Sequence, residues 1–430
     1  MPTWSLFAAA ATGALMLPAA ASAQSSSFFD RTVNTPVASR SHPEYEALGI
    51  DLGGFTMYPK LSVAAGYDDN IYGTEDKTGS ALVTTAPSLE FASNWGRNSA
   101  DIHLRYERDE YIANDSESTS EFSLTSTGRI DVDHASAITL TLNAADLYES
   151  RTAPDAVASL ARPVEYDLIT SGVAAYREFG RFRLEGSVTN NYYSYYNTPL
   201  LSGAIEQESL RDEDAISETL RLSYALSPNF AAFVQINPNQ SQFLSQQPIT
   251  SASLNSNGYS ALAGVNLQLT HLLTADVGVG YLSQSYADPA IESVTGLAFN
   301  VSVQYFPTQL ITVGLHADHS IQGSGVPGTP ASDVNEGSLT LDYELLRNVI
   351  ISPQLGLSKY DYPGTSLSST RFTAGLNASY LINRWLGLSA SYRYVNQSSS
   401  GSTDAVGVLE GIGIFNFSDN QVMLTVTLQR

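Results

Sequence analysis

Residues 101–110 read "DIHLRYERDE", and this stretch restricts the fold more than any other part of the chain. In a β-strand, successive side chains point to opposite faces. One face then carries only ionisable residues: Asp101, His103, Arg105, Glu107 and Asp109. The opposite face carries Ile102, Leu104 and Tyr106. Such a strand needs water or partner charges on one side and an apolar environment on the other.

Alternation with a period of two recurs along the chain after about residue 57. In "AITLTLNA" (137–144), the threonines face away from the leucines, and in "LTADVGVGYLSQ" (273–284), Asp276 faces away from the valines. A soluble β-sandwich has the same alternation. The pattern therefore predicts strands without choosing between a sandwich and a barrel.

The lengths of the connections make that choice. Very short turns recur at 94–98, 133–136, 178–182, 227–229, 270–273, 307–309, 346–348 and 383–385. Longer polar connections lie between them at 152–163, 196–210, 244–254, 325–332 and 400–419. Bacterial outer-membrane barrels have short periplasmic turns and longer extracellular loops. We therefore predict an all-β protein, a single transmembrane up-and-down antiparallel β-barrel of about 18 strands.

Aromatic residues cluster at both ends of the expected strands. Beside the short turns lie Trp95, Phe179, Phe182, Phe230, Phe306 and Trp385. Near the other ends lie Tyr67, Tyr72, Tyr111, Tyr148, Tyr192, Tyr193, Tyr195, Tyr196, Tyr286, Tyr360 and Tyr362. Two aromatic belts are expected where a barrel meets its two water interfaces, although tyrosines also favour strands in general.

The chain is predicted to have three parts. Residues 1–24 contain an apolar run ending in "ASA" and are typical of an export signal peptide. Residues 25–56 lack a strand period and are expected to form a periplasmic N-terminal segment that hangs free, plugs the lumen or docks onto periplasmic machinery. Residues 57–430 form the expected outer-membrane barrel.

Residues 39–74, "SRSHPEYEALGIDLGGFTMYPKLSVAAGYDDNIYGT", resemble the N-terminal signature of the bacterial family called putative β-barrel porin 2. The matching residues are Pro43, Glu44, Tyr45, Leu52, Gly53, Phe55, Tyr58, Pro59, Leu61, Gly66, Tyr67, Asp68, Asp69 and Asn70. The segment "DNQVMLTVTLQR" (419–430) is similar to the family's closing strand. The resemblance implies one barrel in the bacterial outer membrane and a link to exopolysaccharide secretion.

A polar face on each strand predicts a set of pore-lining residues. They are Asp101, His103, Arg105, Glu107, Arg183, Glu185, Arg221, Asp276, His316, Asp318, Asp342, Glu344 and Arg393. Both signs of charge occur, which predicts ion pairs between neighbouring strands. Small inward residues are expected to give the pore smooth walls: Thr139, Thr141, Gly278, Gly280, Ser389 and Ser391.

Two motifs invite a metal interpretation. In "GYDDNIYGTEDKTGS" (66–80), an EF-hand would need Glu at the twelfth loop position, where Gly79 stands. We expect a solvated hairpin tip there, with a cation site that bridges carboxylates to lipopolysaccharide as the alternative. In "HADH" (316–319), His316 and Asp318 share a face while His319 points away, so at most two ligands converge and no metal is predicted.

These observations predict a passive conduit across the outer membrane, with a secreted exopolysaccharide as the expected cargo. A general diffusion porin for small hydrophilic solutes and a closed barrel that acts as a scaffold or adhesin are the alternatives. No catalytic grouping or cofactor is expected. Expected partners are outer-membrane lipid and lipopolysaccharide, the assembly machinery and periplasmic secretion components. The net charge of −22 argues against nucleic acid, and the absence of cysteine excludes disulfides and thiolate metal sites.

Overall fold

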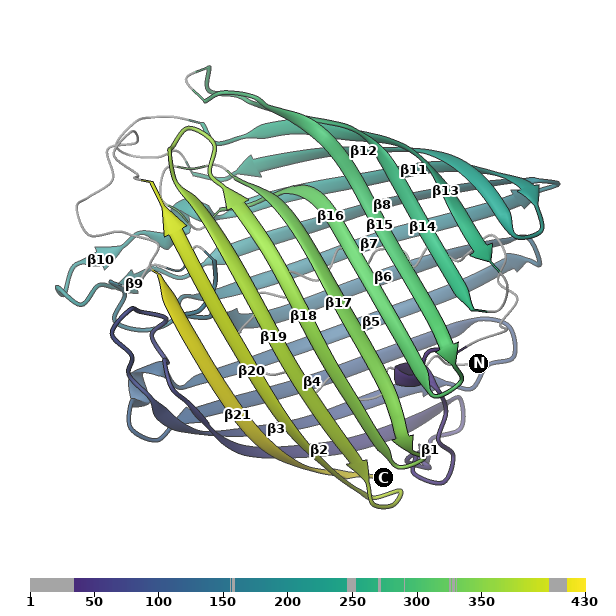
Figure 1. The fold of residues 1–430 in the computed structure, drawn as a ribbon, viewed down its shortest axis with the longest axis horizontal. Coiled ribbons are helices and arrows are strands. Elements are labelled where there is room, and N and C mark those ends of the chain that lie inside the picture. The colour runs from purple at the N-terminus through teal and green to yellow at the C-terminus, as the bar shows by residue number, and fades with distance from the viewer. Residues whose placement is uncertain are drawn as a thin grey trace.

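The protein is a closed antiparallel β-barrel in a computed structural model (Figure 1). The structure describes residues 35–430 except 155, 157–158, 246–252, 270–271, 290, 325, 327–328, 330 and 402–415. The predicted signal peptide lies outside the described residues. Figure 1 shows the strands running obliquely, so that the front and back walls cross each other. This tilt is what closing a sheet on itself requires.

Consecutive antiparallel hairpins form the barrel wall of 18 strands. The strands are β2 (Phe55–Asp68), β3 (Ser80–Ser93), β4 (Ser99–Tyr111), β5 (Thr119–Asp133), β6 (Ser136–Tyr148), β7 (Glu165–Phe179), β8 (Phe182–Tyr195), β11 (Glu213–Ser227), β12 (Phe230–Phe243), β13 (Ser256–Leu269), β14 (Leu273–Tyr286), β15 (Val294–Thr308), β16 (Ile311–Gln322), β17 (Ser332–Leu346), β18 (Val349–Asp361), β19 (Ser368–Leu381), β20 (Leu386–Ser400) and β21 (Phe417–Gln429). The predicted fold class is confirmed.

Short elements lie outside the wall. β1 (Ile50–Asp51) pairs with the start of β2, and β9 (Thr198–Pro199) pairs with β10 (Ile205–Glu206) in the connection between β8 and β11. The 3-10 helices are η1 (Val37–Ser39), η2 (Asp115–Glu117) and η3 (Glu208–Arg211). Within the described residues, no helix has the length and apolar character that a membrane span requires.

The first and last barrel strands close the wall. β2 pairs with β3 on one side and with β21 on the other, in a register that runs from Lys60 opposite Gln429 to Asp68 opposite Gln421. Closure satisfies the backbone groups that an edge strand would leave open, which is a strict requirement in lipid. The seam between β2 and β21 joins residues from opposite ends of the chain.

The short turns lie at one end of the barrel, where the sequence predicted them. Several are tight hairpins with a register irregularity just before the turn, such as those at Asp131/Asp133, Ala225/Ser227 and Glu344/Leu346. A bulge next to a short loop matches the twist of the two strands. The connections at the opposite end are longer, as at 149–164 and 196–212.

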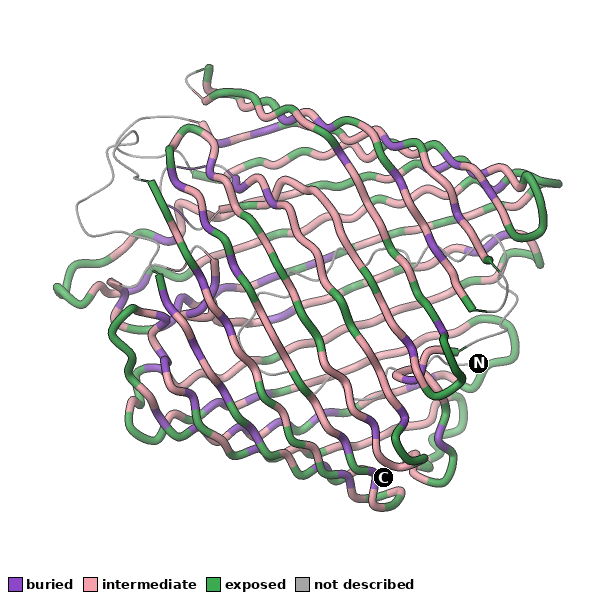
Figure 2. The backbone as a smooth tube through the Cα atoms, viewed as in Figure 1, coloured by how far each residue is buried: buried purple, intermediate pink, exposed green. Residues whose placement is uncertain are grey.

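The burial of successive residues varies along the strands of the wall (Figure 2), as expected when side chains point alternately to its two faces. On β14, Val279 and Tyr281 are 53% and 48% exposed on the outer face, whereas Gln284 is buried on the inner face. The exposed apolar side chains form the surface that lipid covers in a membrane, because hydrocarbon carries no hydrogen-bonding partner for polar groups. The inner face is largely polar.

The aromatic residues follow the predicted belts only in part. Trp95, Phe179, Phe182 and Trp385 are exposed beside the short turns. Phe306 is buried instead, on the inner face. At the other end, Tyr67 and Tyr192 are exposed. Tyr111, Tyr193 and Tyr195 turn inward by strand parity, and Tyr362, which follows β18, is buried. Proximity to a strand end therefore did not determine which face a ring occupies.

Candidate functional site

The lumen is the candidate functional site, and its charged residues form several small clusters. On β4, Arg105 donates a hydrogen bond to the Glu107 carboxylate two residues along the same strand. His103 lies opposite Glu90 of β3 in the strand register. Asp101 lies one step further toward the short turns, opposite Ala92. The inner-face charges of "DIHLRYERDE" thus lie against a further acidic residue that the sequence analysis did not single out.

Arg183 makes the second cluster, near the short turn between β7 and β8. Its Nη1 lies 3.1 Å from Glu178 Oε1, and its Nη2 lies 3.0 Å from Glu185 Oε1. The guanidinium lies over the Tyr176 ring, 4.2 Å from the centroid. A cation held by two carboxylates and an aromatic face is well compensated for its burial.

Arg221 makes the third cluster and spans the inner wall. Its Nη2 lies 2.5 Å from Asp276 Oδ2 on β14, although β12 and β13 separate the two strands. The Phe233 ring lies under the guanidinium at 3.5 Å, and Asn266 also donates to Asp276. Gly278 was expected to smooth the wall, but a Cβ there would lie 3.2 Å from Phe233, so this glycine makes room for the ring.

His316 and Asp318 form a pair on β16, with Nε2 3.0 Å from Oδ1. Glu336 of the neighbouring strand β17 brings a third ligand atom within 4.8 Å of the others. The sequence analysis expected at most two converging ligands, and this expectation was wrong because Glu336 lies opposite Asp318 in the β16–β17 register. His319 faces the outer side, where it pairs with Asp333.

Asp342, Glu344 and Arg393 pair with residues that were not among the predicted pore-lining residues. Asp342 accepts a hydrogen bond from Ser352 Oγ at 2.6 Å. Glu344 pairs with Arg40 of the N-terminal segment, with Nη1 2.5 Å from Oε2. Arg393 pairs with Asp419 of β21 at 3.1 Å. The ion pairs run along one strand or reach across several strands as well as between neighbours, so the prediction of neighbouring pairs was too narrow.

The N-terminal segment enters the end of the barrel that carries the short turns. The Val37 backbone N–H donates to Thr312 Oγ1 at 3.0 Å, and Val37 is fully buried. Arg384 donates to the Pro43 carbonyl, and Gln429 donates to the Tyr45 carbonyl. Residues 35–46 therefore lie against the inner wall, at the periplasmic mouth of the expected arrangement.

Neutral hydrogen-bonding side chains line the wall between these charges. Thr125 donates to Asn143 Oδ1, Thr170 to Asn191 Oδ1 and Thr219 to Asn237 Oδ1, at 2.9 to 3.1 Å. Each pair joins two neighbouring strands and uses the amide oxygen of the asparagine. We call these six residues the Thr–Asn band. The asparagine NH₂ groups of Asn143 and Asn191 are left to donate elsewhere.

The connection between β6 and β7 reaches across the opposite mouth. Arg151 forms a two-point ion pair with Glu117, with Nε and Nη2 at 2.8 and 3.0 Å. Further along, the Thr152 carbonyl accepts a hydrogen bond from Arg371 of β19, and the Pro154 carbonyl accepts one from Gln397 of β20. Both donors are buried on the inner wall. Residues 149–154, the crossing loop, therefore narrow the outer mouth.

A second loop covers the inward tyrosines. Tyr195 stacks with Tyr166 at 5.3 Å between centroids, and Arg211 lies 4.2 Å above the Tyr195 ring. Arg211 also pairs with Glu149 and Glu208. Burial raises the pKa of Glu208 above its ordinary value, and the Arg211 guanidinium opposes this only in part. These rings anchor a loop, so they are not a free platform for sugar stacking.

Comparison with known proteins identifies the family. A family model described as putative beta-barrel porin 2 matches residues 42–430. The chain belongs to this family. No curated protein matches the chain. The family match confirms the resemblance noted at residues 39–74, and it makes the protein a porin-like barrel of the bacterial outer membrane.

Solved structures similar to this family member are barrels of low sequence identity. A ferric enterobactin receptor (PfeA) mutant from Pseudomonas aeruginosa and the siderophore receptor PirA from Acinetobacter baumannii each show 7% identity and a TM-score of 0.47, covering 87% of this chain and 80% of theirs. OpdO from Pseudomonas aeruginosa shows 12% identity and a TM-score of 0.44, covering 87% of this chain and 97% of its own.

One expectation for this porin-family barrel held only in part at the outer mouth. In the stretch 66–80, expected to be a solvated hairpin tip, residues 75–78 are exposed, but Asp68, Asn70 and Ile71 are buried. The Asn70 side chain donates to the Thr74 and Ser418 carbonyls, and Gly73 approaches the Arg151 backbone closely. Sequence alone predicts that such short polar residues are solvated, because their partners lie far away in the sequence.

Sequence analysis also missed several residues of the lumen. Lys60 of β2 and Glu90 of β3 lie on the inner face, and the period-two alternation of their strands would have predicted this. Arg371 of β19 also lies on the inner face that alternation assigns, although its loop partner has no such signal. Arg40 and Arg151 gave no signal, because they lie outside the barrel strands. Alternation can find wall residues, whereas loop contacts need the tertiary structure.

Proposed function

We propose that the barrel is a non-enzymatic passive conduit for a secreted exopolysaccharide across the outer membrane. An 18-stranded barrel has the circumference for an aqueous lumen. The observation that carries the proposal is the Thr–Asn band. Neutral amides and hydroxyls exchange hydrogen bonds with sugar hydroxyls without the tight binding that a charged site gives, and a conduit must let its cargo leave.

Loop and N-terminal residues narrow both mouths of the barrel, which favours passage of an extended polymer over an open pore. The crossing loop contacts the β19–β20 wall at the outer mouth, and residues 35–46 lie at the opposite mouth. An extended polysaccharide can pass a narrow lumen one sugar at a time. Side-chain charges in the lumen, such as the neighbouring Arg183 and Arg221 clusters, would set the preference for neutral or charged sugars.

The direct test joins conductance with sugar flux. The purified full chain in planar bilayers is expected to conduct ions, and liposomes containing it are expected to swell slowly with disaccharides. Deletion of the gene is expected to reduce secreted polysaccharide. Absence of conductance, both in the full chain and after removal of residues 25–46, would overturn the proposal and favour a closed scaffold.

A matched variant set tests the band itself. The triple variant Asn143→Ala, Asn191→Ala, Asn237→Ala widens the lumen, so ion conductance should stay equal or rise. Sugar flux should nevertheless fall several-fold, because the amide donors are lost. The control changes the inner hydroxyls Ser302→Ala and Ser338→Ala on the opposite wall. If sugar flux follows ion conductance in both sets, the barrel is a general diffusion porin.

A further inference from the structure

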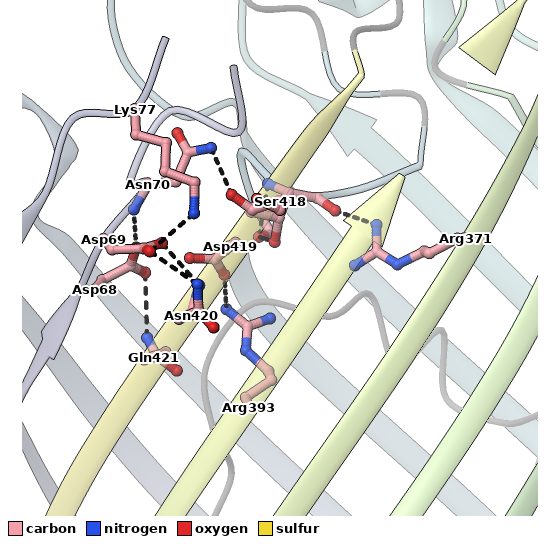
Figure 3. Close-up of polar contacts among 12 residues, drawn as sticks. Asp68, Asp69, Asn70, Lys77, Arg371, Arg393, Ser418, Asp419, Asn420 and Gln421 are labelled. Carbon is pink, nitrogen blue, oxygen red and sulfur yellow. Dashed lines mark hydrogen bonds and ion pairs between the residues drawn. The ribbon is translucent and has the colours of Figure 1, made fainter. Parts of the chain in front are cut away.

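Three carboxylates meet at the seam where the barrel closes, on the outer-mouth side (Figure 3). Asp68 ends β2, Asp69 follows it, and Asp419 lies near the start of β21. Each offers an oxygen, and these atoms lie within 4.8 Å of one another. Asp68 and Asp419 are 2% and 0% exposed. We call these residues the seam cluster.

Backbone pairing holds the cluster together. The Asp69 backbone N–H donates to the Asn420 carbonyl at 3.0 Å, and the Asn420 backbone N–H donates to Asp69 Oδ1 at 2.8 Å. The Asn70 backbone N–H donates to Asp68 Oδ1 at 2.9 Å. Asp69 Oδ2 accepts two hydrogen bonds, from Lys77 Nζ and Asn420 Nδ2, both at 2.8 Å, whereas Asp69 Oδ1 and Asp68 Oδ1 each accept one. A carboxylate oxygen has about two acceptor positions, so Asp68 and Oδ1 of Asp69 can accept a further ligand.

Asp419 supplies the observation that points to a ligand. Its Oδ2 accepts a hydrogen bond from Arg393 Nη2 at 3.1 Å, but its Oδ1 is buried and has no donor among the described residues. Figure 3 shows this free oxygen directed toward Asp68 and Asp69, away from Arg393. A buried carboxylate oxygen without a partner is costly.

A neutral oxygen lies beside the carboxylates. Gln421 is 1% exposed, its Nε2 donates to Asp68 Oδ2 at 3.4 Å, and its Oε1 has no donor in the described part of the chain. Rotating this amide by half a turn would bring Oε1 to the position from which Nε2 now approaches Asp68. Among the described residues, the site thus offers carboxylate and amide oxygens, with no nitrogen or sulfur ligand.

The charges of the surroundings do not balance the seam cluster. Lys77 Nζ lies 2.8 Å from Asp69 Oδ2, and Arg393 pairs with Asp419, so two cations face three carboxylates. The wall beneath is apolar, with Ala64, Leu82 and Met423 packed together. From β4, Asp109 adds a buried carboxylate that Thr84 satisfies. The apolar wall screens charge poorly, and the three carboxylates outnumber the two cations beside them. Both conditions favour an added cation.

We propose that the seam cluster binds one divalent hard cation of the calcium class. Calcium takes six to eight oxygen ligands in irregular geometry, whereas magnesium needs a near-ideal octahedron. Ligands from Asp68, Asp69 and Asp419 would join the first and last strands of the wall at the outer mouth. The ion would stabilise the closed barrel, and this role is independent of the proposed cargo.

The first test measures heat stability and binding on the purified full chain in detergent micelles. Adding Ca²⁺ after chelation is expected to raise Tm by about 2 °C or more, and titration calorimetry should give one site. Mg²⁺ at the same concentration should have a smaller effect. No Ca²⁺-dependent change in Tm, or an equal response to Mg²⁺, would overturn the proposal.

The variant Asp68→Asn gives a sign that structural damage would not give. Asp68 is buried and forms no ion pair with a described residue, so without Ca²⁺ its neutralisation relieves the repulsion by Asp69 and Asp419, and the chelated variant should melt at a higher temperature than the chelated native protein. Its Tm should no longer respond to Ca²⁺. The matched control Asp342→Asn removes the same charge elsewhere on the inner wall, and it should retain the full Ca²⁺ response.

Lys77→Gln separates the cation site from its rival, a proton shared by Asp68 and Asp419. Because Lys77 competes for Asp69, its removal should tighten Ca²⁺ binding by several-fold. Under a shared proton, the chelated native protein would lose Tm as the pH rises through neutral, Asp68→Asn would abolish this loss, and Ca²⁺ would change nothing. That set of results would overturn the proposal.

Discussion

Arg221 and Asp276 meet across two intervening strands of the inner wall, with Nη2 2.5 Å from Oδ2. Their side chains are 9% and 14% exposed, and Phe233 lies beneath the guanidinium. The pair links β11 to β14 without using the backbone ladder. Its contribution to stability is measurable because each partner depends on the other to offset its burial.

Removing one partner of this pair should be more damaging than removing both. Asp276→Asn should lower the free energy of unfolding by about 3 kcal/mol, because it leaves the Arg221 charge without its counter-ion. The double variant Arg221→Met, Asp276→Asn should recover part of that loss. Denaturant unfolding in a double-mutant cycle checks this, and additive losses would contradict it.

An arginine should be tolerated on one face of the wall and not on the other. Val279→Arg places a charge on the lipid-facing surface, where it should cost roughly 2–4 kcal/mol near the bilayer midplane. Asn300→Arg lies one residue away in register on the inner face, opposite Asp318. It should fold normally. Folding yield into lipid vesicles compares the two, and equal yields would contradict the assigned faces.

Releasing the crossing loop should widen the outer mouth. Glu117→Gln removes the carboxylate that holds Arg151 at two points, so residues 149–154 should lose their position. Mean single-channel conductance should rise and become noisier. Arg347→Gln, at an exposed periplasmic turn, is the control and should leave conductance unchanged. A drop in conductance would mean that the loop does not obstruct the path.

Breaking the Arg40–Glu344 pair should free the N-terminal segment. Arg40→Gln removes the contact to a buried carboxylate on β17, so the segment should detach from the wall more often. Limited proteolysis on the periplasmic side should then cut residues 35–46 faster than in the native protein. Glu344→Gln should act in the same direction. Unchanged cleavage in both variants would show that backbone contacts alone hold the segment.

The loop that carries Glu208 should become less stable as pH rises. Burial raises the pKa of Glu208 in the folded protein. The protonated form therefore contributes stability below the ordinary pKa of Glu, about 4.3, and this contribution is lost as pH rises through the higher folded pKa. Glu208→Gln should remove that dependence. Melting curves from pH 4 upward on both proteins check it, and parallel curves would contradict it.

Most of the wall could be predicted from the sequence, because its rules are local. A period of two and a bilayer on one side determine which residues of "DIHLRYERDE" turn inward, since each residue's face depends only on its place in the strand. The short turns identified the hairpins for the same reason. Gly278 shows the limit, because its role depends on Phe233 from a strand that is not its neighbour.

The contacts that shape the lumen were decided only by the tertiary structure. Asp68 and Gln421 meet because closure of the barrel joins its first and last strands, and the crossing loop meets Arg371 because it folds inward. The period-two alternation of the strands predicts neither the closure contact nor the position of the crossing loop. The sequence by itself determined that this chain forms a barrel, since strand pattern and lipid act on each residue in turn. Closure and loop packing then decided which residues meet, because both depend on the whole circumference at once.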